Sequence, residues 1–135
     1  MRRKIWIGVA GMLLAVGAAG AASQHTVSVT LNYDFSVDNA CGGSVTTGCV
    51  KQFNIYDITG GATPVKLFSI AAPSGANSAV TGIVGTSGAL ALKAGVHTFA
   101  ATAQMADGTE SSPNASTATA PVAPGSPASF SVTVQ

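Results

Sequence analysis

Residues 26–37 alternate polar and apolar side chains without interruption. The apolar residues occupy the odd-numbered positions Val27, Val29, Leu31, Tyr33, Phe35 and Val37. Successive side chains of a strand point to opposite faces, so this segment is predicted to be a strand with one apolar face. A strand with one apolar and one polar face is typical of an antiparallel sheet that covers a core on one side.

A period of two recurs along the chain, and the runs are separated by clusters of Gly, Ser, Asp and Pro. Further strands are expected at 50–58, 63–72, 79–85, 89–94 and 96–105, and 128–134 alternates again. The first two of these are expected to form a hairpin around 59–61, because Gly60 and Gly61 supply turn conformations. Segment 38–49 is predicted to be a loop, and 114–127 an extended, Pro-rich stretch. The predicted fold is all-β, a single sandwich of about six or seven strands.

The N-terminal segment has the pattern of a secretory signal peptide. The basic stretch MRRK precedes twelve uncharged, mostly apolar residues at 5–16, and small residues follow. The apolar run is shorter than the ~20 residues of a spanning helix, so cleavage is expected, with an uncleaved membrane anchor as the alternative. Cleavage is expected after Ala21 or after Ser23. The expected organisation is a signal peptide at 1–23 and a sandwich at 24–135, which places the product outside the cell or in the periplasm.

Removal of the leader would change the charge of the chain and the partners it can bind. The six basic residues would fall to three, which gives a net charge of 3 − 5 = −2 instead of +1. The mature chain would contain no Arg. Nucleic acids and anionic membrane surfaces attract clusters of Lys and Arg, so neither is an expected partner.

The two cysteines, Cys41 and Cys49, are expected to form a disulfide, as cysteine pairs of exported proteins usually do. Closing so short a loop would stabilise the fold by roughly 2–3 kcal/mol. The spacing is not that of a C-x-x-C redox motif, and further zinc ligands are missing from the neighbourhood in sequence. The expected effect is a stiffer loop between two strands.

Three stretches of the chain resemble a fibronectin type III domain of the kind found in secreted bacterial proteins. They are SVTLNYDF (28–35), FNIYD (53–57) and LKAGVHTFAATAQMADGTESSP (92–113). The resemblance covers most of 27–120 and implies an immunoglobulin-like sandwich. This chain departs from the family pattern where Tyr33 replaces a Trp and where Ala94 replaces a Pro.

The resemblance also implies that a first strand is missing, because only a few mature residues would precede 27–37. Segment 128–134 could fill that position, either within its own chain or by strand exchange with a neighbour. Alternatively, 128–134 is the last strand and 114–120 is a loop.

Few residues could carry chemistry. His25 would be close to a new N-terminus and could bind copper there only with His97 beside it and with cleavage after Gln24. Asp34, Asp38 and Asn39 could contribute to a calcium site, but calcium needs about six to eight oxygen ligands. His25 is expected in a solvated tail and His97 as a half-buried ring in a strand or corner, while the side chains of Asp34, Asp38 and Asn39 are expected to be solvated. Neither a metal nor another cofactor is expected.

The sequence favours a binding or structural role over catalysis. It has no G-x-S-x-G elbow and no evident pair of catalytic carboxylates, so an enzyme is not expected. Tyr56 falls out of phase with the apolar Phe53 and Ile55 and is the best candidate for an exposed ring. Together with Asp38 and Asn39 it forms the candidate binding surface.

The expected function is therefore that of a non-catalytic, secreted module with a structural, adhesive or protein-interaction role at the cell surface. Its partner would be an extracellular protein or glycan that the sequence does not identify. Two alternatives are a carbohydrate- or ligand-binding accessory domain and a subunit that assembles by strand exchange through 128–134.

Overall fold

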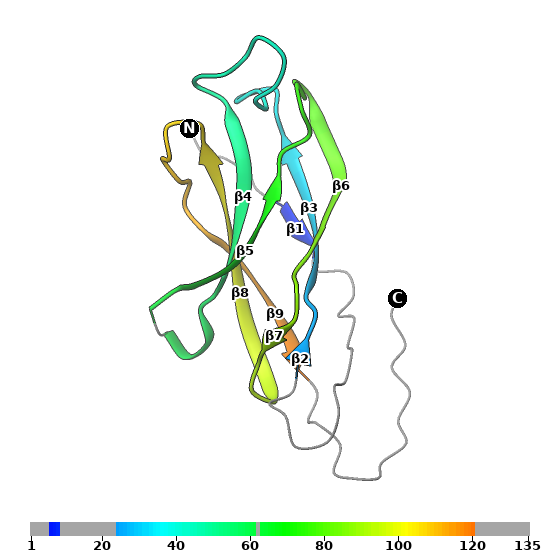
Figure 1. The fold of residues 1–135 in the computed structure, drawn as a ribbon, viewed down its shortest axis with the longest axis vertical. Helices are drawn as coiled ribbons and strands as arrows, with labels where there is room; N and C mark the ends of the chain where they lie inside the picture. Colours follow the sequence, from blue (N-terminus) through cyan, green and yellow to red (C-terminus); the bar gives the residue numbers. More distant parts are fainter. Residues whose placement is uncertain (1–5, 9–23, 62, 121–135) are drawn as a thin grey trace.

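The computed structural model describes residues 6–8, 24–61 and 63–120, which form an all-β sandwich (Figure 1). The described strands are β1 (Trp6–Gly8), β2 (Gln24–His25), β3 (Ser28–Asp34), β4 (Val50–Asp57), β5 (Val65–Ala71), β6 (Ala79–Thr86), β7 (Leu90–Ala91), β8 (Gly95–Met105) and β9 (Asn114–Ala120). A short 3-10 turn, η1 (Thr59–Gly61), follows β4. Within these residues, no helix is long and apolar enough to span a membrane.

Two antiparallel sheets make up the sandwich. One has the strand order β1-β3-β6 and the other the order β5-β4-β8-β9, while β2 and β7 form a separate two-stranded ribbon. The predicted hairpin is confirmed, because β4 and β5 pair antiparallel on either side of η1. The predicted strand at 89–94 is confirmed only in its first half, as β7.

The alternation in 26–37 has the predicted consequence for burial. Leu31, Tyr33 and Phe35 are buried, and the polar residues between them are partly or fully exposed. The expectation is wrong at Val37, which is 59% exposed. The strand ends at Asp34, whose Oδ1 accepts a hydrogen bond from the Ser36 N–H at 2.9 Å and turns the chain. This turn breaks the period of two before it reaches Val37.

Aromatic side chains from both sheets meet in the middle of the core. The Tyr33 ring centroid lies 4.7 Å from that of Phe35 and 5.2 Å from that of Phe53, which comes from β4 in the facing sheet. The tilted and edge-on arrangements are those that aromatic pairs prefer. The three rings therefore join the two sheets directly.

The C-terminal part of the structure corrects one of the two alternatives for this region. Residues 114–120 are not a loop, because they form β9, which pairs antiparallel along β8 from Ala101 to Gly95. The missed strand contains only Asn, Ala, Ser and Thr, and such residues give no alternation of hydrophobicity. Backbone hydrogen bonding to the long edge of β8 makes it a strand. Segment 128–134 lies outside the described residues.

Three residues of the predicted leader also belong to the described structure. β1 pairs antiparallel with β3 at Thr30, Leu31 and Asn32, and it contacts β9. It therefore occupies the edge of β3 that the missing first strand would cover. The remainder of the predicted signal peptide, with both expected cleavage sites, lies outside the described residues.

A close approach between the sheets at Gly85 leads to a first prediction. A methyl group on Gly85 would lie 2.2 Å from Cγ1 of Ile70, a buried residue of the facing sheet. We expect Gly85→Ala to reduce the free energy of unfolding by about 1–3 kcal/mol, because overpacking forces side chains and backbone to shift. Urea-induced unfolding followed by circular dichroism measures the change.

Gly88→Ala is the matched control for this prediction. A methyl group on Gly88 meets no atom within 4 Å. Its only expected effect is a small gain in stability, because alanine restricts the unfolded chain more than glycine does. Equal stabilities of the two variants would contradict close packing of β6 on β5.

Candidate functional site

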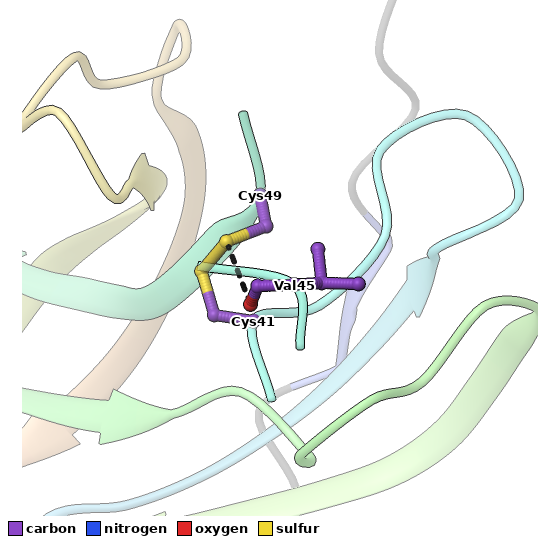
Figure 2. Close-up of a disulfide and its surroundings, with 3 residues drawn as sticks. All are labelled: Cys41, Val45 and Cys49. Atoms are coloured by element: carbon purple, nitrogen blue, oxygen red, sulfur yellow. Dashed lines mark hydrogen bonds between the residues drawn. A yellow bond between two sulfur atoms is a disulfide. The ribbon is translucent and has the colours of Figure 1, made fainter. Parts of the chain in front are cut away.

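The disulfide closes a loop at one end of the sandwich. Cys41 and Cys49 are bonded to each other, with 5.0 Å between their Cα atoms, as the sequence predicted (Figure 2). The Sγ of Cys49 also lies 3.7 Å from the carbonyl oxygen of Val45, inside the loop. The bond indicates that the protein matures in an oxidising compartment.

Backbone contacts hold this loop against the turn that joins β5 to β6. The N–H of Gly75 donates to the carbonyl of Cys41 at 3.2 Å, and the N–H of Ala40 donates to the carbonyl of Ala76 at 2.8 Å. Gly42 is required at the contact, because a Cβ there would lie 2.2 Å from the Ser74 Oγ. The loop is therefore fixed by the disulfide and by its neighbour.

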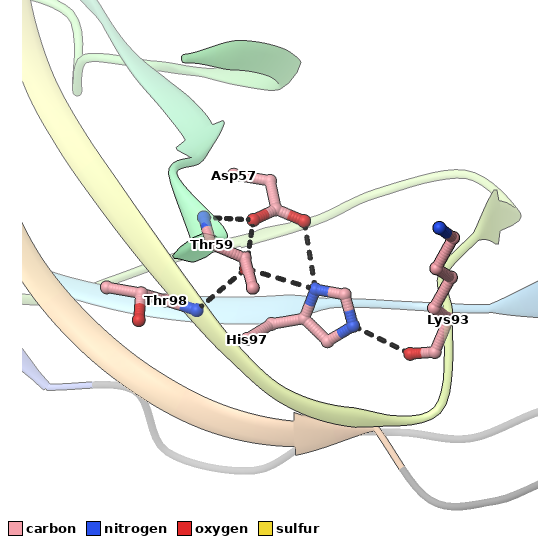
Figure 3. A network of polar contacts seen from close by, with 5 residues as sticks. All are labelled: Asp57, Thr59, Lys93, His97 and Thr98. Atoms are coloured by element: carbon pink, nitrogen blue, oxygen red, sulfur yellow. Dashed lines mark hydrogen bonds and ion pairs between the residues drawn. The ribbon is translucent and has the colours of Figure 1, made fainter. Parts of the chain in front are cut away.

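A second polar cluster surrounds His97 on β8. Its Nδ1 lies 2.9 Å from Asp57 Oδ2, and its Nε2 lies 2.7 Å from the carbonyl oxygen of Lys93 (Figure 3). A neutral imidazole has one N–H and can donate to only one of these acceptors, whereas an imidazolium donates to both. The ring thereby ties the end of β4 to the segment that leads into β8.

Thr59, at the start of η1, completes the cluster around His97. Its hydroxyl donates to Asp57 Oδ1 and accepts a hydrogen bond from the N–H of Thr98 at 3.1 Å. The hydroxyl lies 3.3 Å from His97 Nδ1, the same nitrogen that faces Asp57. In a nucleophile–histidine–acid triad the nucleophile and the acid contact opposite ring nitrogens. The geometry differs from that arrangement and fits a cluster that fastens a turn.

The pKa of Asp57 follows from these contacts. Burial acts to raise the pKa of the carboxyl, but hydrogen bonds from Thr59 and His97 outweigh it and hold the pKa below its ordinary value. Because this pKa is lower in the folded state than in the unfolded state, the ionised carboxylate stabilises the fold above the unfolded-state pKa. That contribution is lost as the pH falls through the folded-state pKa.

The solvated state expected for His25 is wrong, because β2 holds its side chain in the interior, where it is less exposed than any other ionisable side chain of the described residues. It is 2% exposed, and neither ring nitrogen has a hydrogen-bond partner among those residues. Burial lowers the pKa of His25, and the charge of His97 lowers it further. The two histidines are therefore within electrostatic reach of each other, but both nitrogens of His97 are already engaged. Within the described ranges, no three His, Cys, Asp or Glu side chains are grouped as metal ligands would be.

The most extensive polar cluster of the described residues lies on the outer face of the four-stranded sheet, over β5, β4 and β8. We call it the Glu110 network; its members are Gln52, Asn54, Tyr56, Ser69, Thr102, Gln104 and Glu110. β4 directs Phe53 and Ile55 into the core, so the residues between and beside them point outward. β8 contributes its own polar residues beside them.

Glu110 reaches this face because the chain turns back after β8. The Thr109 N–H donates to Asp107 Oδ1 at 2.9 Å, and Gly108 has a φ of 91°, which favours glycine. Asp107 and Gly108 therefore form a turn at this point. It brings Glu110 into a bridge with Gln104 on the outer face of the sheet.

The carboxylate of Glu110 is the centre of the network. It accepts hydrogen bonds from Asn54 Nδ2 at 2.8 Å, from the Tyr56 hydroxyl at 2.8 Å and from Thr102 Oγ1 at 2.6 Å. Burial acts to raise the pKa of Glu110, but these hydrogen bonds outweigh it and lower the pKa. Burial and the neighbouring carboxylate raise the pKa of Tyr56. At neutral pH the pair is therefore a carboxylate and a neutral phenol.

Amide groups extend the network across the sheet. Asn54 is fully buried, and its Oδ1 accepts hydrogen bonds from Gln52 and Ser69, each at 2.8 Å. Gln52 also donates to Gln104 Oε1 at 2.8 Å. Donors and acceptors are thus paired within the network, and the half-buried ring of Tyr56 lies at its margin.

The structure separates the residues of the candidate binding surface. Tyr56 lies on the outer face of its sheet, as its phase predicts, whereas Asp38 and Asn39 lie in the loop before the disulfide. The carbonyl of Asn39 accepts from the N–H of Val50 at the start of β4, six residues and about 20 Å from Tyr56. Glu110 was not predicted as the partner of Tyr56. The polar residues on either side of Phe53 and Ile55 indicate a polar outer face on β4, but they do not identify the residue that Tyr56 contacts.

Comparisons with known proteins return no match among family models, curated proteins or solved structures. The resemblance to fibronectin type III domains therefore stays a prediction.

The Asp57 cluster leads to a prediction about acid stability. Thr59→Val removes a hydroxyl that donates to Asp57 and accepts from Thr98, which raises the pKa of Asp57 in the folded state. We expect acid-induced unfolding to begin at a higher pH, together with a loss of about 1–3 kcal/mol near neutral pH. Fluorescence- or dichroism-monitored unfolding across a pH series measures both effects. Thr63→Val, at an exposed position after η1, is the control, and superimposable pH curves for the two variants would refute the assignment.

Proposed function

We propose that this chain is a secreted, non-catalytic β-sandwich module with a structural, adhesive or protein-interaction role at the cell surface. The observation that carries the proposal is an all-β sandwich with a disulfide-closed loop, whose polar clusters are paired internally. Side chains that are fastened to one another stabilise a scaffold, whereas a catalytic group must be able to reach a substrate.

The order of strands supports a relation to fibronectin type III domains. Sandwiches of the immunoglobulin type place strands A, B and E in one sheet and C, F and G in the other. The orders β1-β3-β6 and β5-β4-β8-β9 fit that scheme if β3 is the second strand and β5 the additional strand beside the third. Modules with this architecture commonly act as spacers or binding units outside cells.

Export gives the direct test of this proposal. The full chain is produced in a bacterium with a C-terminal tag. We expect it in the periplasm or medium, with an intact mass that corresponds to a chain beginning at Ala22 or Gln24. Its two cysteines should resist alkylation until a reductant is added. An unprocessed, cytoplasmic chain with free thiols would refute the proposal.

The Glu110 network favours one second candidate, a carbohydrate-binding accessory domain. The half-buried ring of Tyr56 lies at the margin of hydroxyl, amide and carboxylate groups on the outer face of the sheet, and its hydroxyl donates to Glu110. Sugar rings offer hydroxyl groups to such side chains and an apolar face to an aromatic ring. The loop that carries Glu110 would then form one wall of the binding surface.

Binding to immobilised polysaccharides distinguishes this second candidate. Tyr56→Ala should weaken binding about tenfold or more, equivalent to ~1.4 kcal/mol, whereas Tyr56→Phe should retain most of it if the ring stacks on the sugar. Val96→Ala, at an exposed position of β8, serves as the control. Binding that Tyr56→Ala leaves unchanged, or no binding to any polysaccharide tested, would exclude this role.

A further inference from the structure

Among the described residues, the outer edge of β3 is covered by β1, which belongs to the predicted leader. On one side β3 pairs with β6 over its whole length, and on the other it pairs with the three residues of β1. Removal of residues 1–23 would leave the backbone N–H and C=O groups on that side without strand partners among residues 24–61 and 63–120. The inference below rests on the proposed export, because export removes β1.

The freed edge would be a good template for another strand. β3 contains neither Lys nor Pro, the residues that commonly protect edges from pairing. Beneath the edge lie Val29, Leu31 and Tyr33, all of them buried core residues. The opposite edge of the same sheet is less suitable, because Gly82 in β6 has a φ of 74° at a point where the pairing register shifts.

Segment 128–134 has the pattern of a strand that fits this edge. Its residues Phe130, Val132 and Val134 alternate with small polar ones, and its seven residues equal the length of β3. The outer side of β8 is already occupied by β9, so this segment does not take that position.

Segment 128–134 could pair with β3 of its own molecule or with β3 of a second copy. The direction in which the chain leaves β9 distinguishes these two cases. Ala120, the last residue of β9, pairs with Gly95, close to the ribbon of β2 and β7 from which β3 starts (Figure 1). A strand that pairs antiparallel with β3, as β1 does, must begin at the far end, near Asp34.

The linker is barely long enough to reach that far end within one molecule. Pro-rich chain spans about 3.1 Å per residue, which gives about 25 Å for the eight steps from Ala120 to Ala128. The linker must cover the length of β3, about 23 Å, and also the spacing between the two sheets, about 10 Å. Because these two distances are roughly perpendicular, the straight line between the end points is about 25 Å. No residue would remain for the reversal of direction. A neighbouring molecule can offer the Asp34 end of its β3 without this constraint.

We propose that segment 128–134 of one copy pairs antiparallel with the freed edge of β3 in a second copy, so that the exported protein assembles head to tail. The donor and acceptor sites lie at different places on each molecule, so the contact is heterologous and can continue from copy to copy. The partner of this module is then another molecule of the same chain.

Sedimentation velocity on the exported, full-length mature chain tests the proposal. We expect a concentration-dependent series of oligomers for the wild-type chain and monomers for Val132→Pro, because proline removes a backbone donor and disrupts strand pairing. Val122→Pro places the same residue in the extended linker and should assemble like the wild type. A synthetic peptide of residues 128–134 should dissociate the oligomers, whereas a scrambled peptide should not.

The outcomes separate this inference from the proposed function. An intact mass without residues 1–23 combined with a monomeric wild-type chain would overturn the assembly and leave the secreted module in place. A monomer whose melting temperature falls on Val132→Pro would show that the segment pairs within its own chain, which also overturns the inference. An intact mass that retains the leader would contradict both, because β1 would still cover β3.

Discussion

The contact of Tyr33 and Phe35 with Phe53 across the sandwich is the interaction on which the rest of the structure depends. Tyr33 lies on β3, Phe35 directly follows that strand, and Phe53 lies on β4 in the opposite sheet, with ring centroids 4.7 to 6.2 Å apart. Burial of one such side chain contributes about 1.5–3 kcal/mol, and a whole small domain is stable by only about 5–15 kcal/mol. Tyr33, Phe35 and Phe53 are three of the four aromatic side chains in the buried core cluster, and the fourth is Phe99.

The two ends of the sandwich are closed by different means. At one end the Cys41–Cys49 bond and backbone contacts fix a glycine-rich loop, and at the other His97 fastens η1 to β8 through Asp57. The chain has only eleven Lys, Arg, Asp and Glu residues, so surface ion pairs contribute little. Hydrogen-bonded clusters and one covalent bond take their place. This use of the polar residues is the physical basis for proposing a scaffold rather than a catalyst.

The sequence predicts the strands whose side chains alternate and fails where pairing depends on partners far along the chain. β3 and β4 follow from a period of two, because their apolar residues point to one buried face. β5 and β8 follow it less strictly, because β5 buries only Ile70 and β8 is buried on both faces from Phe99 to Ala103. β9 does not, because its Ala, Ser and Thr residues show no such contrast, and only the edge of β8 makes it a strand. The same limit applies to the Glu110 network: the outward phase of Tyr56 is readable from β4, but its hydrogen bond to Glu110 joins residues 54 positions apart. Asp38 and Asn39 are not part of this network, because they precede β4 at its other end.

The edges of the two sheets differ in how well their residues prevent another strand from pairing with them. β5 carries Lys66, and β9 is preceded by Pro113 and followed by Pro121, so both edges of the four-stranded sheet have residues that discourage further pairing. β3 has no such residue, although its inward side chains are among the most deeply buried in the molecule. An edge of this kind exposes both hydrogen-bonding groups and core when it is uncovered. A sequence that protects two edges and leaves this one open is consistent with a strand that covers it in the finished protein.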